Sequence, residues 1–259
     1  MTEPALPSLL LLTLAAAAAG LVNALAGGGT LITFPVLTAI GVPSVRANMT
    51  NTVALCPGYL GGALAQRKDL VGQEHRLRRF AVAGALGGLV GAVLLTITSE
   101  ALFKNIVPYL ILAACALLGF QDRLKRWLGR HGHHGGDSAS TPLAVFAVSI
   151  YGGYFGAGIG IMMIAAFSLL ISDNTTRINA LKNWMSLTIN VVAAAFFVTR
   201  SLVSPHGNRV WWALVPGMAV AALAGGAAGG KLAGRLQPVL LRRLVITFGV
   251  VVALVYLVR

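Results

Sequence analysis

Ala26-Gly-Gly-Gly-Thr-Leu31 interrupts a long apolar run near the start of the chain, and Gly156-Ala-Gly-Ile-Gly-Ile161 interrupts a second one past the middle. The first break separates apolar residues 5–26 from 31–40, and the second divides the run 142–171. A helix needs about 20 apolar residues to span a membrane, so 31–40 is too short for a crossing and 142–171 is too long for one straight helix. We therefore predict a glycine-broken, re-entrant hairpin at each break.

The composition is that of a membrane protein. Of 259 residues, 57% are hydrophobic and 10% are charged, and the mean hydropathy is +0.81. Further apolar runs lie at 47–65, 80–98, 101–120, 178–199, 210–228 and 244–258. Together they predict an all-α polytopic membrane protein with about 8 to 10 membrane helices. The first run follows Glu3 and Pro4 without a basic segment, so we expect it to be retained, with a cleaved signal peptide as the alternative.

The two halves of the chain resemble each other. In each half the glycine break is followed by a polar segment that begins with arginine, Arg46-Ala-Asn-Met-Thr-Asn51 or Arg177-Ile-Asn-Ala-Leu-Lys182, and then by small residues with GxxxG spacing. A polar, basic segment at 121–141 separates the halves. We predict a first membrane repeat at 1–120, a linker at 121–141 and a second repeat at 142–259, each repeat comprising a broken hairpin and three spanning helices.

The positive charges predict how the halves are oriented. Most of the 20 Lys and Arg residues lie in three segments, 67–79, 121–141 and 231–243. The positive-inside rule places all three in the cytoplasm, which requires each broken hairpin to return to the side from which it entered. The two repeats then have inverted topology, as in transporters whose site lies where broken helices meet. We expect a multi-pass plasma-membrane protein with a cytoplasmic linker and both termini outside.

The placement of titratable residues excludes several kinds of function. All 7 Asp and Glu residues and all 5 His residues lie at segment ends or in loops. A carboxylate proton relay, a metal site and an intramembrane protease each need such groups at depth, so we expect no metal, no other cofactor and no catalytic residues. Cys56 and Cys115 stand inside apolar runs and indicate no disulfide framework. The net charge of +13 follows from topology, so no nucleic-acid partner is expected.

The polar residues near the two breaks are neutral or positive, which suits an anion. Glycine breaks offer backbone N–H groups at half-helix N-termini, and Asn, Ser and Thr side chains add donors. A lysine near the bilayer centre, which is where Lys182 is expected, costs about 2.5 to 3.5 kcal/mol on insertion scales. The predicted substrate-binding residues are Asn23, Gly27, Gly28, Gly29, Thr30, Asn48, Asn51, Thr52, Gly158, Gly160, Lys182, Asn183 and Ser186.

Three of the charged residues have a structural alternative. Lys182 could extend to the membrane surface as an anchor instead of binding a substrate. Arg46 and Arg177 follow predicted helix starts, a position more typical of interfacial anchors than of ligands.

Several motifs together point to a family. They are the glycine-rich run 26–31, its continuation Phe34-Pro-Val-Leu37, the turn Gly41-Val-Pro43, the polar helix start at 46–52 and the echo of this pattern in the second half. With them the chain resembles the sulfite exporter TauE/SafE family. The resemblance implies a polytopic carrier in the bacterial inner membrane for sulfite, sulfonates or thiosulfate. The chain departs from an even repeat because Asn51 stands where the second half has Lys182, so the two half-sites are chemically unequal.

We therefore expect a secondary transporter or channel-like exporter of small sulfur-containing anions, in which the two breaks face each other at mid-membrane and one half rocks against the other. The alternative is a membrane scaffold or assembly factor that transports nothing and uses exposed GxxxG faces at 84–91 and 225–230. Those glycines are otherwise interpreted as packing devices, and they could also join two copies of the chain in a homodimer.

Overall fold

The computed structural model describes residues 6–25, 27–131, 140–203, 210–233 and 239–258. These residues form ten α-helices and one short 3-10 helix, with no strand among them, which confirms the predicted all-α class. The elements are α1 (Leu6–Leu25), α2 (Thr30–Ala39), α3 (Ser44–Ala65), η1 (Arg67–Leu70), α4 (Glu74–Ile97), α5 (Glu100–His131), α6 (Thr141–Tyr154), α7 (Ile159–Leu170), α8 (Thr175–Val203), α9 (Val215–Leu232) and α10 (Val239–Val258). Within the described residues α1, α4, α8 and the Glu100–Phe120 part of α5 are long and apolar enough to cross a membrane.

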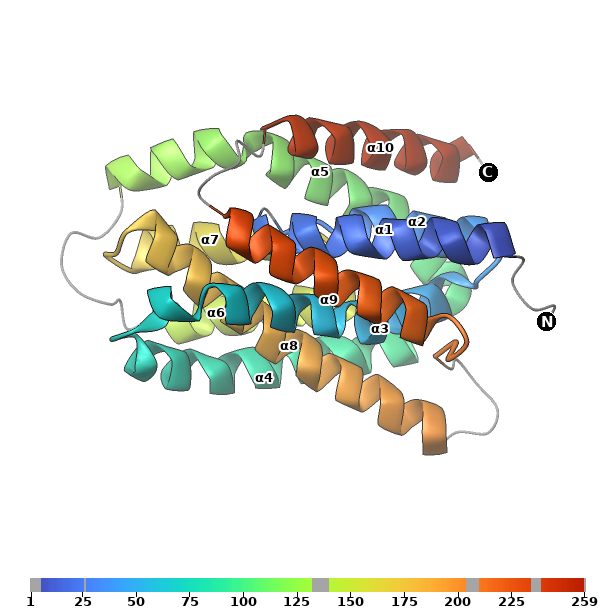
Figure 1. Ribbon diagram of the computed structural model, residues 1–259, viewed down its shortest axis with the longest axis horizontal. Coiled ribbons are helices and arrows are strands. Elements are labelled where there is room, and N and C mark those ends of the chain that lie inside the picture. The colour runs from blue at the N-terminus through green and yellow to red at the C-terminus, as the bar shows by residue number, and fades with distance from the viewer. Residues whose placement is uncertain (1–5, 26, 132–139, 204–209, 234–238, 259) are drawn as a thin grey trace.

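Both glycine breaks turn the chain back on itself. Helices α1 and α2 form one hairpin and α6 and α7 form the other, and the two enter the bundle from opposite ends (Figure 1). Gly27 and Gly158 have φ angles of 74° and 76°, a left-handed conformation that glycine adopts without strain. The returning helices have only 10 residues in α2 and 12 in α7, so neither crosses a bilayer. The predicted re-entrant hairpins are confirmed.

The two halves of the chain interlock. Helix α4 of the first half packs against α6 and α8 of the second, and α9 of the second half packs against α1 and α3 of the first. A Cβ on Gly91 would lie 2.0 Å from the carbonyl oxygen of Ile150, and a Cβ on Gly226 would lie 2.0 Å from that of Gly58. Backbones approach this closely only where side chains are absent.

The GxxxG segments are therefore packing devices within one chain. The glycines at 84–91 and 225–230 are buried, so the exposed faces that the scaffold alternative needs do not exist in this structure. A homodimer stays a prediction, and these faces give it no support because the chain itself covers them.

The basic segments gather at one end of the bundle. Figure 1 shows that η1, the start of α4 and the ends of α5 and α9 lie at the left, where α6 and α8 also begin. Helix α1 begins and α10 ends at the right. We name the left end the basic end and the right end the terminal end. The arrangement agrees with the prediction that the three basic segments share one side of the membrane.

Helix α5 is longer than its apolar run. The apolar part ends at Phe120, but the helix continues to His131 through the first part of the predicted linker. Leucine, lysine and arginine are good helix formers, which explains why the helix continues into this polar stretch. The rest of the linker up to 139 lies outside the described residues. The division into repeats at 1–120 and 142–259 stays a prediction.

Candidate functional site

The two glycine breaks meet inside the bundle. A Cβ on Gly27 would lie 2.5 Å from the Cα of Gly160, and a Cβ on Gly160 would lie 2.8 Å from the Cα of Gly27. The first hairpin therefore touches the second through bare backbone. The sequence placed the two breaks opposite each other, and the structure brings them into contact.

Lys182 reaches this contact from α8. Its side chain is fully buried, with 0% of its surface exposed. Its Nζ donates hydrogen bonds to the carbonyl oxygens of Asn23, at 3.2 Å, and Ala24, at 3.3 Å. These carbonyls belong to the last turn of α1, where the partial negative charge of a helix end attracts a cation. The ammonium group thus stays inside the bundle and does not extend to a membrane surface.

Two buried polar atoms near Lys182 have no hydrogen-bond partner among the described residues. They are Nδ2 of Asn23 and Oγ of Ser186. The other end of the Asn23 amide accepts a hydrogen bond from Gly29 N at 2.7 Å, which leaves its nitrogen unpaired. Ser186 stands one turn after Lys182 on the same face of α8. An unsatisfied buried donor costs roughly 1–3 kcal/mol, so both atoms are candidates to bind a further group.

The matching stretch of the first half forms a separate hydrogen-bonded cluster. Asn51 on α3 accepts a hydrogen bond from Thr33 Oγ1 and donates one to Thr30 Oγ1 at 3.4 Å, so it ties α3 to the start of α2. The sequence analysis missed Thr33. It stands one turn after Thr30 on the same short helix, and that spacing is the signal that could have found it.

Most of the remaining predicted residues have structural partners. Asn48 Nδ2 donates to the carbonyl oxygen of Tyr154 at 2.7 Å, although Asn48 Oδ1 has no hydrogen-bond partner among the described residues. Thr52 Oγ1 donates to the carbonyl oxygen of Asn48 at 3.0 Å. Asn183 Nδ2 donates to the carbonyl oxygen of Ala24 at 3.4 Å.

Two of the predicted glycines face α5 and not Lys182. A Cβ on Gly28 would meet Leu118, and one on Gly158 would meet Ala114. All the predicted site residues are buried, so this conformation is closed around the site.

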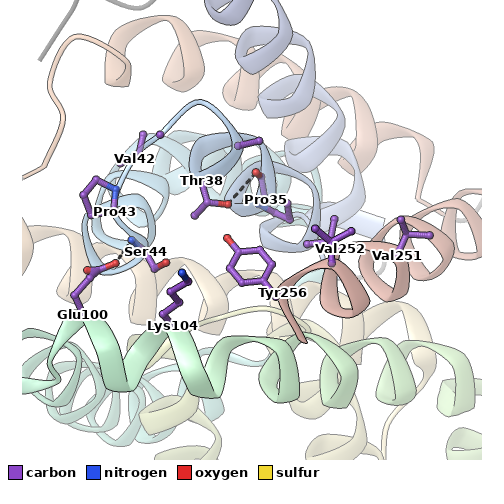
Figure 2. Close-up of a pocket in the computed structure, with 13 residues that line it drawn as sticks. Pro35, Thr38, Val42, Pro43, Ser44, Glu100, Lys104, Val251, Val252 and Tyr256 are labelled. Carbon is purple, nitrogen blue, oxygen red and sulfur yellow. Dashed lines mark hydrogen bonds between the residues drawn. The ribbon is translucent and has the colours of Figure 1, made fainter. Parts of the chain in front are cut away.

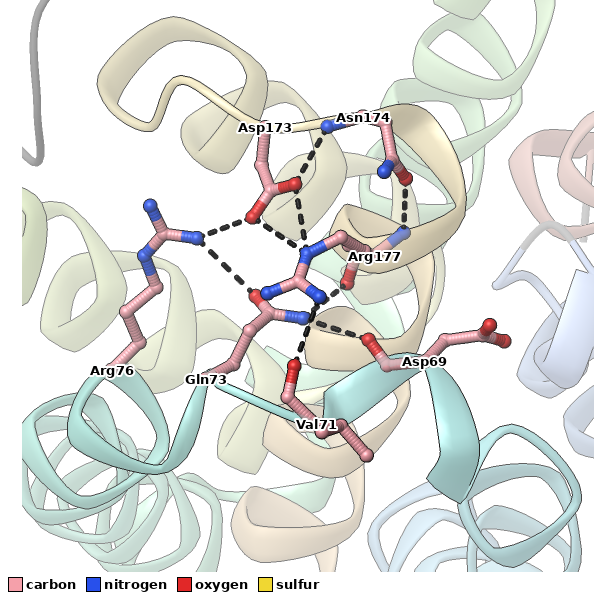
Figure 3. A network of polar contacts seen from close by, with 7 residues as sticks. All are labelled: Asp69, Val71, Gln73, Arg76, Asp173, Asn174 and Arg177. Carbon is pink, nitrogen blue, oxygen red and sulfur yellow. Dashed lines mark hydrogen bonds and ion pairs between the residues drawn. The ribbon is translucent and has the colours of Figure 1, made fainter.

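A polar network closes the basic end (Figure 3). Asp173, in the turn before α8, forms ion pairs with Arg76 of α4 and with Arg177 of α8, the latter at 2.9 Å. Arg177 Nη1 donates to the carbonyl oxygen of Val71 at 2.9 Å, and Gln73 Nε2 donates to the carbonyl oxygen of Arg177 at 3.3 Å. The network therefore joins the turn before α4, in the first half, to the start of α8, in the second.

An equivalent arginine joins the halves at the terminal end. Arg46, the counterpart of Arg177 in the repeated motif, lies with its guanidinium carbon 5.9 Å from the centre of the Trp211 ring. The backbone N–H of Trp211 donates to Thr50 Oγ1 at 2.9 Å. Each arginine thus contacts the turn between two helices of the other half. The sequence analysis favoured an interfacial anchor for both Arg46 and Arg177. It could not predict these contacts, because contacts between turns far apart in the chain leave no local signal.

The comparisons with known proteins point to transport. A family model described as Sulfite exporter TauE/SafE matches residues 12–256. The probable membrane transporter protein YfcA of Escherichia coli K12 is 26% identical over 224 residues, which cover 83% of this chain and 76% of that protein. A probable membrane transporter protein of Haemophilus influenzae is 27% identical over 238 residues, 88% of this chain and 86% of that protein. The names of these two relatives specify a transporter and no substrate.

Proposed function

The chain belongs to the sulfite exporter TauE/SafE family, and on that premise we propose that it is a secondary transporter or channel-like exporter of small sulfur-containing anions, such as sulfite, a sulfonate or thiosulfate. It is a multi-pass membrane transporter and not an enzyme, in agreement with its family and relatives. We further propose that it resides in the plasma membrane with its basic end in the cytoplasm and that its halves are inverted repeats.

The main support for an anionic substrate is that Lys182 is buried where the two glycine breaks meet. An oxyanion offers several acceptor oxygens and one or two negative charges. The Lys182 ammonium, the Asn23 amide nitrogen and the Ser186 hydroxyl are donors that such an anion would satisfy. On binding, the anion would take the place of the α1 carbonyl oxygens as the partner of Lys182.

Transport requires the closed bundle to open at one end at a time. The Arg177 network holds the basic end and the Arg46–Trp211 contact holds the terminal end, and both join one half of the chain to the other. Rocking of the halves would break one contact while the other persists. An inside-negative membrane potential favours export of a monoanion by about 2.3 kcal/mol per 100 mV, so no intramembrane carboxylate is needed to drive it.

Replacing Asp173 with asparagine is expected to weaken the closed basic end. Partial burial by itself would raise the pKa of Asp173, but hydrogen bonds from Arg177, from the Asn174 backbone and from Arg76 outweigh it and hold the pKa below its ordinary value. A carboxyl whose pKa is lowered by folding contributes stability above its ordinary pKa and loses that contribution as the pH falls through the lowered value. The native protein should therefore keep this contribution, roughly 1–2 kcal/mol, at neutral pH and lose it only in strong acid.

Melting temperatures of the detergent-solubilised protein test this expectation. Asp173→Asn should melt below the native protein at neutral pH, and the difference should shrink as the pH falls below about 4. Asp69→Asn is the matched control, since Figure 3 shows the Asp69 carboxylate turned away from the network. Equal melting temperatures for Asp173→Asn and the native protein at neutral pH would show that the network does not hold this end.

Efflux from liposomes tests the proposed function directly. Purified protein is reconstituted in vesicles loaded with sulfite, thiosulfate or a small sulfonate, and efflux is followed under an imposed membrane potential. We expect saturable efflux of at least one of these anions, faster when the potential drives anions out. Correctly folded protein that releases none of the three would disprove the assigned substrate class.

A further inference from the structure

A cavity lies at the terminal end of the bundle. It has a volume of about 450 Å³ and lies between the end of α2, the turn that follows it, the start of α5 and the end of α10 (Figure 2). Most of its wall is apolar. The apolar lining residues include Pro35, Ala39, Val42, Val251, Val252 and Val255.

The rim of this cavity carries one charge of each sign. Lys104 stands one turn after Glu100 on α5, and Figure 2 shows its ammonium group turned toward the cavity. The Glu100 carboxylate accepts hydrogen bonds from the backbone N–H groups of Ser44 and Val45 at the start of α3. A carboxylate offers about four acceptor positions, so Glu100 can bind a further donor while it caps α3.

The position of the cavity is that of a lipid head group. Helices α2 and α10 end here and α3 and α5 begin here, so the rim lies where the hydrocarbon core of a membrane gives way to its polar surface. On α10, Val251, Leu254 and Val255 are exposed and present an apolar surface beside the cavity. An apolar chain can therefore lie along α10 while the polar end of the same molecule stays at the rim.

We propose that this cavity binds a phospholipid whose head group carries a primary ammonium. The phosphate binds Lys104, the ammonium donates to Glu100, and an acyl chain lies between α2 and α10. The paired charges select a zwitterion over an anion of the same size, because an anionic head group leaves the Glu100 carboxylate facing a negative charge. A quaternary ammonium has no N–H to donate and so binds Glu100 more weakly. This site is independent of the transported substrate.

Native mass spectrometry of the full-length protein in detergent tests the proposal. The probes are phosphatidylethanolamine, phosphatidylcholine and phosphatidylglycerol with identical acyl chains. We expect phosphatidylethanolamine to be retained about 10-fold more tightly than the other two, which corresponds to one charge-assisted hydrogen bond. Lys104→Gln should weaken retention of all three lipids. Glu100→Gln should remove the preference for phosphatidylethanolamine, and its single side-chain oxygen keeps only one of the two hydrogen bonds to the start of α3.

Two further variants test whether retention depends on the cavity itself and not on the overall charge of the protein. Ala39→Trp, which fills the exposed apolar wall, should abolish retention without removing a charge. Arg200→Gln removes an exposed charge from the end of α8 and should change nothing. Equal retention of the three lipids by the native protein, or unchanged retention by both Lys104→Gln and Ala39→Trp, would overturn the proposal. Neither result depends on sulfite efflux, so this site and the proposed function can fail separately.

Discussion

Lys182→Gln is expected to lower the kcat/KM of sulfite efflux from loaded liposomes by roughly 10- to 100-fold, which is the loss of one charge-assisted hydrogen bond of about 1.5–3 kcal/mol. Glutamine keeps an N–H donor for the carbonyl oxygens of Asn23 and Ala24 but removes the positive charge. The variant thus preserves the hydrogen bonding at the end of α1 while it removes the attraction for an anion. Lys182→Met, which removes both, should reduce efflux further and also lower the melting temperature.

The comparison between these two variants identifies the role of the lysine. Lys231→Gln is the matched control because Lys231 is exposed in the last turn of α9. This variant should release sulfite at the rate of the native protein. If Lys182→Gln transports sulfite at the native rate while Lys182→Met is unstable, Lys182 only satisfies the end of α1. The anion would then have to bind elsewhere.

Gly27→Ala is expected to destabilise the fold strongly. The new methyl group would lie 2.5 Å from the Cα of Gly160, and the φ angle of 74° at Gly27 is one that an L-residue adopts only with strain. Overpacking of backbone costs about 1–3 kcal/mol and the left-handed conformation adds about 1–2 kcal/mol. Because native proteins are stable by only about 5–15 kcal/mol, we expect a melting temperature lower by roughly 5–10 °C and little efflux.

Gly160→Ala tests the contact between the two glycine breaks without the backbone strain that Gly27→Ala adds. Its methyl group would lie 2.8 Å from the Cα of Gly27 and 3.1 Å from Lys182 Cδ, so it disturbs the same contact without the special φ angle. We expect a smaller loss of stability than for Gly27→Ala but a comparable loss of efflux, since Lys182 is displaced. Gly119→Ala is the control, because its nearest neighbour would be the Ile246 side chain at 3.7 Å. A Gly160→Ala variant with native melting temperature and native efflux would show that the breaks do not form the site.

The candidate site could be predicted only in part from the sequence. The pairing of glycine breaks with the polar segments at 46–51 and 177–182 singled out Lys182 and its polar neighbours, which the structure buries, and their role in binding stays a prediction. The same reasoning treated Asn48, Asn51 and Lys182 as one set of donors. In the structure Asn51 is hydrogen-bonded to α2 and Asn48 to the end of α6, whereas Lys182 reaches the end of α1. Partners 21 to 159 residues away leave no trace in local spacing.

By itself the sequence determined that this is an all-α membrane protein with two re-entrant hairpins, because helix length and glycine conformation are local properties of the chain. It also predicted that the basic segments share one end. Only the tertiary structure decided that α4 packs among helices of the second half and α9 among helices of the first. It also decided that Gly27 touches Gly160 and that Arg46 and Arg177 join the halves at opposite ends. The physical reason is that these contacts depend on how helices distant in the chain pack, and a periodic pattern records which residues are apolar but not which helix covers them.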